Sequence, residues 1–288
     1  MEAGKYLSYN GAFLPSEEPL VGAANSAFRY GNGFFDTLVL IGNKIVLEEY
    51  HFHRWNDSIH KLCFIRDNLW SNERIRDEIV KVAVKNHSSR FVRVRVNFFG
   101  GNEPLFSSAN KLNFIIETYT LNEDEWQWKE EGISTGIFRN ALKIRDRFSH
   151  LKTNNYLCYI AAAHYAAINH FDDAILLNES GNIVETCVAN IFLIKENKIF
   201  TPPLSEGCVE GTMRKYLIRQ LRLRGHAIIE KPLSETDIFN AEEVFVSNAV
   251  KGLRPIIRCQ EKEFSASLCR QIFQTIVIPL FSPETTVL

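Results

Sequence analysis

Lys152 is the residue whose type and surroundings first point to covalent chemistry. It lies in the stretch SHLKTNNYL (residues 149–157), between a histidine and a polar patch, just before an alanine-rich run that is typical of a helix. A lysine amine can form an imine with a carbonyl compound and then move a proton at the adjacent carbon. A lysine considered alone is by default interpreted as a solvated surface residue. Other residues of the chain must therefore show whether Lys152 belongs to a catalytic site.

Groups that could hold an aromatic cofactor with a phosphate recur elsewhere in the chain. Glu185 follows 33 residues later in an apolar stretch with Ile183 and Val184, which predicts a buried carboxylate. Such a carboxylate can keep a heterocyclic nitrogen protonated by charge pairing. A phosphate needs a forked cation and free backbone N–H groups. Arg54, near the start of a predicted helix, and the predicted helix start at 211–213 supply these two.

The elements before residue 121 predict a small domain. Asn10 and Gly11, and again Gly42 and Asn43, indicate tight turns within strand pairs. Apolar residues at three- and four-residue spacing predict helices over 51–64 and 72–86. Strict alternation predicts a strand over 91–99 with Arg95 on its polar face, and residues 111–120 predict another strand.

The acidic stretch 121–131 has no clear period and is interpreted as the connection between domains of residues 1–120 and 132–288. The second domain is predicted to contain strands over 133–138, 172–178, 183–194, 199–202 and 242–249. Helices are predicted over 154–169, 211–225 and 267–280, with a short one after a capping box at 234–237. Helices interspersed with hairpins, without regular βαβ units, predict an α+β fold.

The composition excludes several classes of protein. The chain has 288 residues, 45% of them hydrophobic, and a net charge of −1, so no strong field attracts nucleic acid or an anionic membrane. No apolar run approaches the ~18 residues of a membrane span, and the N-terminus lacks a signal-peptide pattern. Six cysteines without a CxxC pair indicate reduced, mostly buried thiols, and no metal site is expected. We therefore expect a cytoplasmic protein.

Around Glu185 a longer motif emerges. The motif begins with a glutamate, and five residues later it has an asparagine, an apolar residue and an aromatic residue in succession. An apolar-x-threonine triplet follows. The motif ends with a glycine that lies three residues before an arginine. The matching positions here are Glu185, Asn190, Ile191, Phe192, Ile199, Thr201, Gly211 and Arg214. This pattern resembles the signature of the class-IV aminotransferases, the fold-type IV family of pyridoxal-phosphate (PLP) enzymes. One position departs from it, because Thr212 stands where the family has an aliphatic residue. Arg214 itself is expected to face solvent at the helix start.

The resemblance extends over most of the chain, through FRYGNGFFDTL (28–38), HFHRW (51–55), LKTNNYL (151–157) and FVSNAVKGLRPI (245–256). It implies a two-domain fold with a cofactor cleft between the domains, a homodimer, and a lysine aldimine on Lys152 as the catalytic group. The cofactor-binding residues that it implies are Arg54, Lys152, Tyr156, Glu185, Gly211, Thr212, Met213, Ser247 and Asn248. Tyr156 resembles the tyrosine that bonds the cofactor's phenolic oxygen. Phe35 and Arg95 are the residues that we expect at the substrate.

Three reactions fit this resemblance. They are transamination of branched-chain or related amino acids through an α-carbanion, transamination of D-amino acids, and lysis of 4-amino-4-deoxychorismate to p-aminobenzoate and pyruvate. The first is our expectation and the lyase is the alternative. A phenylalanine in VNFFGG stands where D-amino-acid transaminases have a substrate arginine, which weakens that choice. Arg29, Lys251 and Arg254 are further candidates for carboxylate recognition.

Other functions have less support. A protein that only binds vitamin B6 would not need both Lys152 and Glu185. A cysteine hydrolase using Cys158 and His164 lacks any supporting local pattern. Gly31 and Gly33 do not complete a dinucleotide-binding fingerprint, because the third glycine is absent and no strand–helix unit surrounds them.

Overall fold

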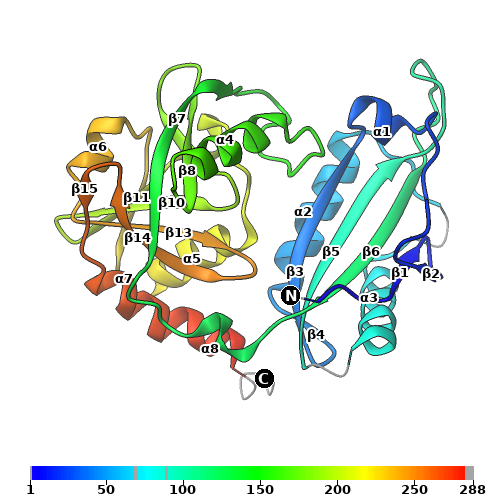
Figure 1. Cartoon of the computed structure of the whole chain (residues 1–288), viewed down its shortest axis with the longest axis horizontal. Coiled ribbons are helices and arrows are strands. Elements are labelled where there is room, and N and C mark those ends of the chain that lie inside the picture. Colours follow the sequence, from blue (N-terminus) through cyan, green and yellow to red (C-terminus); the bar gives the residue numbers. More distant parts are fainter. Residues whose placement is uncertain (1, 68–69, 88–89, 283–288) are drawn as a thin grey trace. The chain divides into compact units, whose positions relative to one another are not determined.

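The computed structural model describes residues 2–67, 70–87 and 90–282, which form two compact units (Figure 1). The first unit contains Met1–Glu125 and the segment Leu151–Asn155, and the second contains Trp126–His150 and Tyr156–Leu288. The chain first passes between the units within the predicted connection 121–131. The units differ from the predicted domains at residues 151–155, which pair with a strand of the first unit. Residue 1 and residues 283–288 of the predicted domains lie outside the described residues.

The first unit is built on a six-stranded sheet of order β2-β1-β6-β5-β3-β4, in which all neighbours are antiparallel. Its elements are β1 (Tyr6–Tyr9), β2 (Ala12–Pro15), α1 (Ser26–Tyr30), β3 (Gly33–Ile41), β4 (Lys44–Ile45), α2 (Glu48–Lys61), α3 (Asn72–Asn86), β5 (Phe91–Gly100) and β6 (Leu112–Thr120). The 3-10 turn η1 (Glu123–Trp126) follows, and its last residue already belongs to the second unit. The predicted turn between β1 and β2 is confirmed, with φ of 52° at Asn10 and 91° at Gly11.

Helices α2 and α3 pack on one face of this sheet. The alternate residues Val92, Val94, Val96 and Phe98 of β5 share one core cluster with Trp55 and Ile59 of α2 and with Ile75, Ile79 and Val82 of α3. This confirms the two helical faces that the three- and four-residue spacing predicts. Arg95 lies on the opposite, polar side of β5, as its alternation requires.

The predicted strand after the Gly42 turn is mostly wrong. Lys44–Ile45 form the strand that pairs with β3, and the N–H of Val46 adds a bond to the carbonyl of Val39 at 2.9 Å. Leu47 has a left-handed φ of 58° that ends the extended chain. Helix α2 then begins with Glu48 and Glu49. Acidic side chains in a first helical turn interact favourably with the helix dipole. The helix therefore starts earlier than its apolar spacing indicates.

The second unit is built on a nine-stranded mixed sheet. Eight strands run in the order β12-β11-β10-β13-β14-β7-β8-β9, and β15 pairs with β14. The elements are β7 (Ile133–Lys143), α4 (Leu157–Ile168), β8 (Asp173–Asn178), β9 (Ile183–Thr186), β10 (Asn190–Lys195), β11 (Lys198–Thr201), η2 (Leu204–Glu206), α5 (Thr212–Leu223), β12 (Ala227–Glu230), α6 (Glu235–Phe239), β13 (Glu243–Asn248), β14 (Gly252–Cys259), β15 (Lys262–Glu263), α7 (Ser267–Ile272), the π-helical η3 (Phe273–Val277) and α8 (Ile278–Phe281).

Helices cover both faces of this sheet around β8. Ala174 and Leu176 pack with Tyr159 and Ala162 of α4, whereas Ile175 and Leu177 belong to the cluster that contains Ile238 of α6. Every residue of β8 is accordingly buried. The capping box predicted for α6 is confirmed, because Ser234 and Asp237 bond reciprocally. Helices α7 and α8 follow at the end of the described chain (Figure 1).

The strand predicted over 183–194 is interrupted. It forms β9 and β10, separated by a tight turn in which the N–H and the hydroxyl of Thr186 both donate to the carbonyl of Ala189. No helix among the described residues combines the length and apolar character of a bilayer span. Four of the six cysteines are buried, as expected, while Cys63 is exposed and Cys158 is half-buried.

Candidate active site

The lysine segment Leu151–Asn155 is fixed to β3 by its main chain. The N–H of Phe35 donates to the carbonyl of Lys152, and the N–H of Asn154 donates to the carbonyl of Gly33, both at 2.9 Å. Gly33 has little room for a side chain beside this segment, because a Cβ atom there would lie 2.4 Å from the side-chain nitrogen Nδ2 of Asn154 and 2.6 Å from the carbonyl oxygen of Phe98. Hydrogen bonds to a strand therefore hold the backbone at Lys152.

Two cations lie against the ring of Phe35. The guanidinium carbon of Arg95 is 3.9 Å from the ring centroid, and Nζ of Lys152 is 4.8 Å from it. An aromatic face attracts cations at these distances. The structure thus brings Lys152 together with both residues expected at the substrate, Phe35 and Arg95.

Arg54 is held by a buried carboxylate. Asp36 on β3 accepts hydrogen bonds from His51 Nδ1 (2.8 Å), from Trp55 Nε1 (2.7 Å) and from Arg54 Nη2. The three donors fall on one face of α2, because they are three and four residues apart from His51. Burial would raise the pKa of Asp36, but the charges of Arg54 and His51 and the hydrogen bonds from His51 and Trp55 outweigh it and hold the pKa well below its ordinary value. This ion pair orients the guanidinium predicted to bind phosphate.

A β-bulge determines which way Glu185 faces. Leu177 of β8 pairs with Ile183, but the residue before it in β8, Leu176, pairs with Glu185. Val184 is therefore an extra residue in β9. Paired residues on antiparallel strands point to the same face. Because Leu176 faces α4, the bulge turns Glu185 toward α4 as well.

Glu185 is 3% exposed and is surrounded by donors. Its Oε1 accepts from the hydroxyl of Tyr159 (2.6 Å), and its Oε2 accepts from Nδ2 of Asn190 (3.2 Å). The N–H of Val209 is shared by both oxygens, at 3.2 and 3.1 Å. Nζ of Lys143 lies 3.8 Å from Oε1. The expectation that Glu185 is a buried carboxylate is confirmed, and Asn190 proves to contact it.

Tyr156 and Tyr159 lie one turn apart at the start of α4 and stack, with ring centroids 4.1 Å apart. The hydroxyl of Tyr156 donates to the carbonyl of Cys187 at 2.8 Å. Burial, reinforced by the charge of Glu185 and its hydrogen bond, raises the pKa of Tyr159 well above its ordinary value. Tyr159 is therefore a neutral donor to Glu185 at physiological pH.

The start of α5 offers backbone and hydroxyl donors. The first N–H groups of an α-helix have no partner within the helix, and Gly211 gives α5 no side-chain cap. Thr212 Oγ1 is buried without a hydrogen-bond partner in the part of the chain that is described. Ser247 Oγ, on β13 opposite Asn190, is likewise buried without a hydrogen-bond partner among the described residues. The side chain of Met213 is fully buried, so only its N–H can act on a ligand.

Two residues near this helix take part in internal packing, and one of them, Arg214, differs from expectation. A side chain at Gly211 would meet Asn190 Oδ1 at 2.0 Å, so internal packing already requires this glycine. Arg214 was expected to face solvent, but it is 4% exposed and donates to the carbonyl of Pro202 and to Glu230, each at 2.8 Å. The prediction failed because helical position alone does not reveal that Pro202 lies above the first turn.

Asn248 organises the loop after β13. Its Oδ1 accepts from the N–H groups of Val250 and Lys251, at 3.1 and 2.8 Å, and its Nδ2 donates to the carbonyl of Val188 at 3.4 Å. The loop is therefore folded around an Asn side chain. Any contact of Asn248 with a cofactor stays a prediction.

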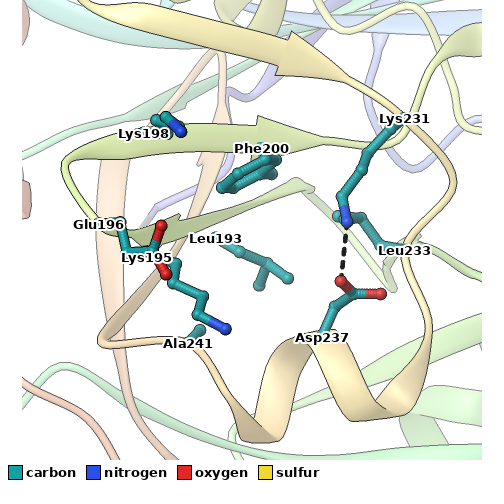
Figure 2. Close-up of a pocket in the computed structure, with 9 residues that line it drawn as sticks. All are labelled: Leu193, Lys195, Glu196, Lys198, Phe200, Lys231, Leu233, Asp237 and Ala241. Carbon is teal, nitrogen blue, oxygen red and sulfur yellow. Dashed lines mark hydrogen bonds and ion pairs between the residues drawn. The ribbon is translucent and has the colours of Figure 1, made fainter.

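A separate hollow of about 220 Å³ opens in the second unit (Figure 2). Leu193, Phe200 and Leu233 line it, and Lys231 pairs with Asp237 at 2.9 Å across it. None of the residues predicted to bind cofactor or substrate lines this hollow. No cluster suited to a metal ion occurs among the described residues.

Comparison with known proteins identifies the fold. A branched-chain aminotransferase from Thermoproteus uzoniensis, solved with norvaline, superposes with a TM-score of 0.84 at 21% identity, covering 96% of this chain and 95% of that one. The branched-chain amino acid aminotransferase from Escherichia coli gives a TM-score of 0.85 at 20% identity, with 98% and 95% of the two chains covered. The α+β fold is therefore that of the fold-type IV PLP enzymes, as predicted.

The sequence model described as amino-transferase class IV matches residues 33–259. The chain belongs to the class-IV aminotransferases, a family of PLP-dependent enzymes. An aminodeoxychorismate lyase from Vibrio harveyi is 25% identical over 236 residues, covering 80% of this chain and 84% of that protein. A branched-chain-amino-acid aminotransferase from Pseudomonas aeruginosa is 23% identical over 278 residues, covering 90% and 86%.

The residues present fit the family's cofactor. Glu185 is a buried acceptor suited to a protonated ring nitrogen. The buried hydroxyls of Thr212 and Ser247, without partners among the described residues, and the start of α5 are suited to a phosphate. Within the first unit, Arg54 is a positioned cation of a kind that is also suited to a phosphate.

Sequence reasoning missed four residues that support the site. Asp36 and His51 lie in stretches that carry the family resemblance, next to residues with expected roles such as Phe35 and Arg54, yet the resemblance gives them no role of their own. Tyr159 could have been found, because it lies three residues after Tyr156 on one helical face. Lys143 gave no such signal, since its contact with Glu185 depends on how β7 and β9 are placed in the sheet.

Proposed function

We propose that this chain is a PLP-dependent aminotransferase for a branched-chain or related amino acid, and that Lys152 and Glu185 act on the same cofactor. The observation that carries the proposal is the buried carboxylate of Glu185, which is enclosed by three hydrogen-bond donors and an ammonium group. A buried carboxylate is stable only when paired and hydrogen-bonded. Its arrangement suits a cationic heterocycle far better than a solvated surface role.

Each predicted residue has a defined part in the proposal. Lys152 binds the cofactor covalently and moves the proton at the α-carbon of the amino acid. Arg54 and the hydroxyls of Thr212 and Ser247 hold the phosphate. Gly211 and Met213 contribute backbone at the start of α5, while Tyr156 and Asn248 border the ring. These last roles rest on the family resemblance.

When bound, PLP draws electrons from the α-carbon of the amino acid as its proton leaves. The protein's contribution is to position the proton carrier and the substrate. Arg95 is suited to hold the substrate carboxylate, because its guanidinium lies on the same aromatic ring as the amine of Lys152. Phe35 provides an apolar surface next to both groups and excludes water from one side.

Lysis of aminodeoxychorismate remains the second candidate. The relative from Vibrio harveyi carries that name and matches 80% of this chain. The stretches ETCVANIF, GTMR and SNAVKGLRPI favour this reaction, whereas NNYL favours the transaminases. Family resemblance also supports a homodimer in the cytoplasm, and both are part of the proposal.

Absorbance spectroscopy tests the enzyme assignment. After incubation with PLP and removal of unbound PLP by gel filtration, the wild-type protein should retain a near-visible band that borohydride removes, and Lys152→Ala should lack the band. Lys231→Ala is the matched control, because Lys231 lies in the separate hollow of Figure 2 and is paired with Asp237. If wild type and Lys152→Ala give the same spectrum, the proposal fails.

Tests with different substrates then distinguish transamination from lysis. We expect glutamate or a branched-chain amino acid, added without a keto acid, to convert the bound cofactor to its aminated form. Failure with every amino acid, together with pyruvate release from aminodeoxychorismate, would reject transamination in favour of lysis.

A further inference from the structure

Lys143 is a partly buried lysine close to Glu185 that the proposed function does not use. It is the last residue of β7, and its side chain is 12% exposed. Its Nζ donates to the carbonyl of Ser149 at 3.0 Å and to the hydroxyl of Tyr159 at 2.6 Å. Lysine is almost never this buried unless it is paired. Its pairing with Glu185 at 3.8 Å is therefore a feature of the site to explain.

The hydrogen-bonding capacity of these groups fixes the direction of each bond. An ammonium group only donates, and a tyrosine hydroxyl has one proton and accepts at its oxygen. Because Lys143 donates to the oxygen of Tyr159, the only proton of Tyr159 is directed to Oε1 of Glu185, 2.6 Å away. Burial and the neighbouring carboxylate raise the pKa of Tyr159, so this proton stays in place. The stacked ring of Tyr156 restricts rotation of Tyr159.

The two oxygens of Glu185 consequently differ. Oε1 receives the short bond from Tyr159 and faces the ammonium of Lys143. Oε2 receives only the longer contacts from Asn190 (3.2 Å) and from the shared N–H of Val209 (3.1 Å). A strong additional donor, such as a protonated ring nitrogen, would therefore be accepted best at Oε2.

We propose that Lys143 is a positioning residue for the ring-nitrogen end of the site: it orients Tyr159 as a donor to Oε1 of Glu185 and places a positive charge beside that same oxygen, so that Oε2 is the oxygen presented to the cofactor. This inference rests on the proposed function, because it concerns the partner of the cofactor's ring. Lys143 touches neither substrate nor cofactor in it.

Two ligands that differ only at the ring nitrogen separate the contribution of this nitrogen to binding affinity from the contributions of all other groups. Pyridoxamine 5'-phosphate carries the nitrogen and forms no imine with Lys152, and its 1-deaza analogue has a C–H group in the same place. The ratio of their dissociation constants measures the contribution of the Glu185 contact. Charge-assisted hydrogen bonds are roughly twice as strong as neutral ones. Replacing Lys143 by methionine removes the donor that orients the Tyr159 hydroxyl toward Oε1, so the Tyr159 proton can turn away and the two oxygens of Glu185 are no longer distinguished. The preference for the nitrogen-containing ligand should then fall by about tenfold, the loss of roughly one hydrogen bond.

Three further variants distinguish the loss of the Lys143 charge and of the hydrogen-bond orientation of Tyr159 from a general loss of protein stability. Lys143→Arg keeps the cation and should keep most of the wild-type preference. Lys143→Gln keeps a donor for Tyr159 but loses the charge, and it stands in if the methionine variant does not fold. Lys231→Met removes another lysine of an ion pair in the second unit, the pair drawn in Figure 2, and should leave the preference unchanged.

Each result has a definite meaning. A fall in preference with Lys143→Met or Lys143→Gln, with retention in Lys143→Arg, supports the inference. If the uncharged variants weaken both ligands equally, Lys143 only stabilises the fold and the inference is overturned. An equal affinity of the wild type for the two ligands also overturns it. Failure of the wild type to bind either ligand would instead refute the proposed function itself.

Discussion

Replacing Asp36 by asparagine tests the most completely buried charge cluster of the first unit. Asp36 accepts from His51, Arg54 and Trp55, and it is 0% exposed. The substitution leaves the guanidinium of Arg54 buried without its carboxylate and places an amide N–H₂ group against donors. Breaking a buried ion pair in this way costs about 3–5 kcal/mol. For a protein of this size the melting temperature should fall by roughly 10 °C.

The effect should also depend on pH. The pKa of Asp36 is lower in the folded protein than the value of about 3.9 in an unfolded chain. Its stabilisation is therefore complete above that unfolded value and is lost as pH falls through the folded-state pKa. Scanning calorimetry between pH 3 and 8 should show the difference between wild type and variant shrinking below about pH 4.

Asp57→Asn is the matched control on the same helix. Asp57 pairs with Lys61 at 2.9 Å, but both side chains are partly exposed. An exposed pair contributes about 1 kcal/mol or less. If Asp36→Asn melts within 2 °C of Asp57→Asn at neutral pH, on the order of 1 kcal/mol, the argument from the Asp36 cluster is refuted.

Three predictions concern the start of α5. Gly211→Ala forces a Cβ atom against Oδ1 of Asn190 and should destabilise the protein by about 1–3 kcal/mol, as measured by urea denaturation. Thr212→Val removes a buried hydroxyl without a partner among the described residues, so the apo protein should melt no lower, while its affinity for pyridoxamine 5'-phosphate falls by about tenfold in a fluorescence titration. Arg214→Met breaks the buried bond to the carbonyl of Pro202 and the part-buried bond to Glu230, and it should lower the free energy of unfolding by about 1–3 kcal/mol, again in urea.

Contrary results would be equally clear. A Gly211→Ala protein of wild-type stability would mean that Asn190 has room to move. A lower melting temperature with unchanged ligand affinity in Thr212→Val would mean that the hydroxyl serves the fold. For Arg214, the control is Arg222→Met, which removes an exposed partner of the same Glu230 and should have a small effect. Equal effects of the two would show that burial of Arg214 adds nothing.

The fold could be predicted from sequence where local patterns act alone. The buried faces of α2 and α3, the turn at Asn10 and Gly11, and the capping box at Ser234 follow from spacing and turn chemistry. Features set by pairing in the sheet could not be predicted in this way. The bulge that turns Glu185 toward α4 depends on the register between β8 and β9, which has no signature in β9 alone.

In the candidate site, too, residues that local motifs reveal differ from residues whose contacts depend on tertiary packing. Family motifs predict Lys152, Glu185 and Arg54 as site residues, because the chemistry proposed for each depends on residue type. The groups that hold these side chains come from other elements, such as Asp36 on β3 and Lys143 on β7. Their contacts form only when strands and helices pack, so spacing along the chain does not reveal them.

The covalent attachment site of the cofactor tests the central claim most directly. The purified protein is incubated with PLP, reduced with borohydride, digested and analysed by peptide mass spectrometry. We predict one modified peptide with the phosphopyridoxyl group on Lys152. Attachment at Lys143 or another lysine in place of Lys152, or no modified peptide at all, would contradict the account.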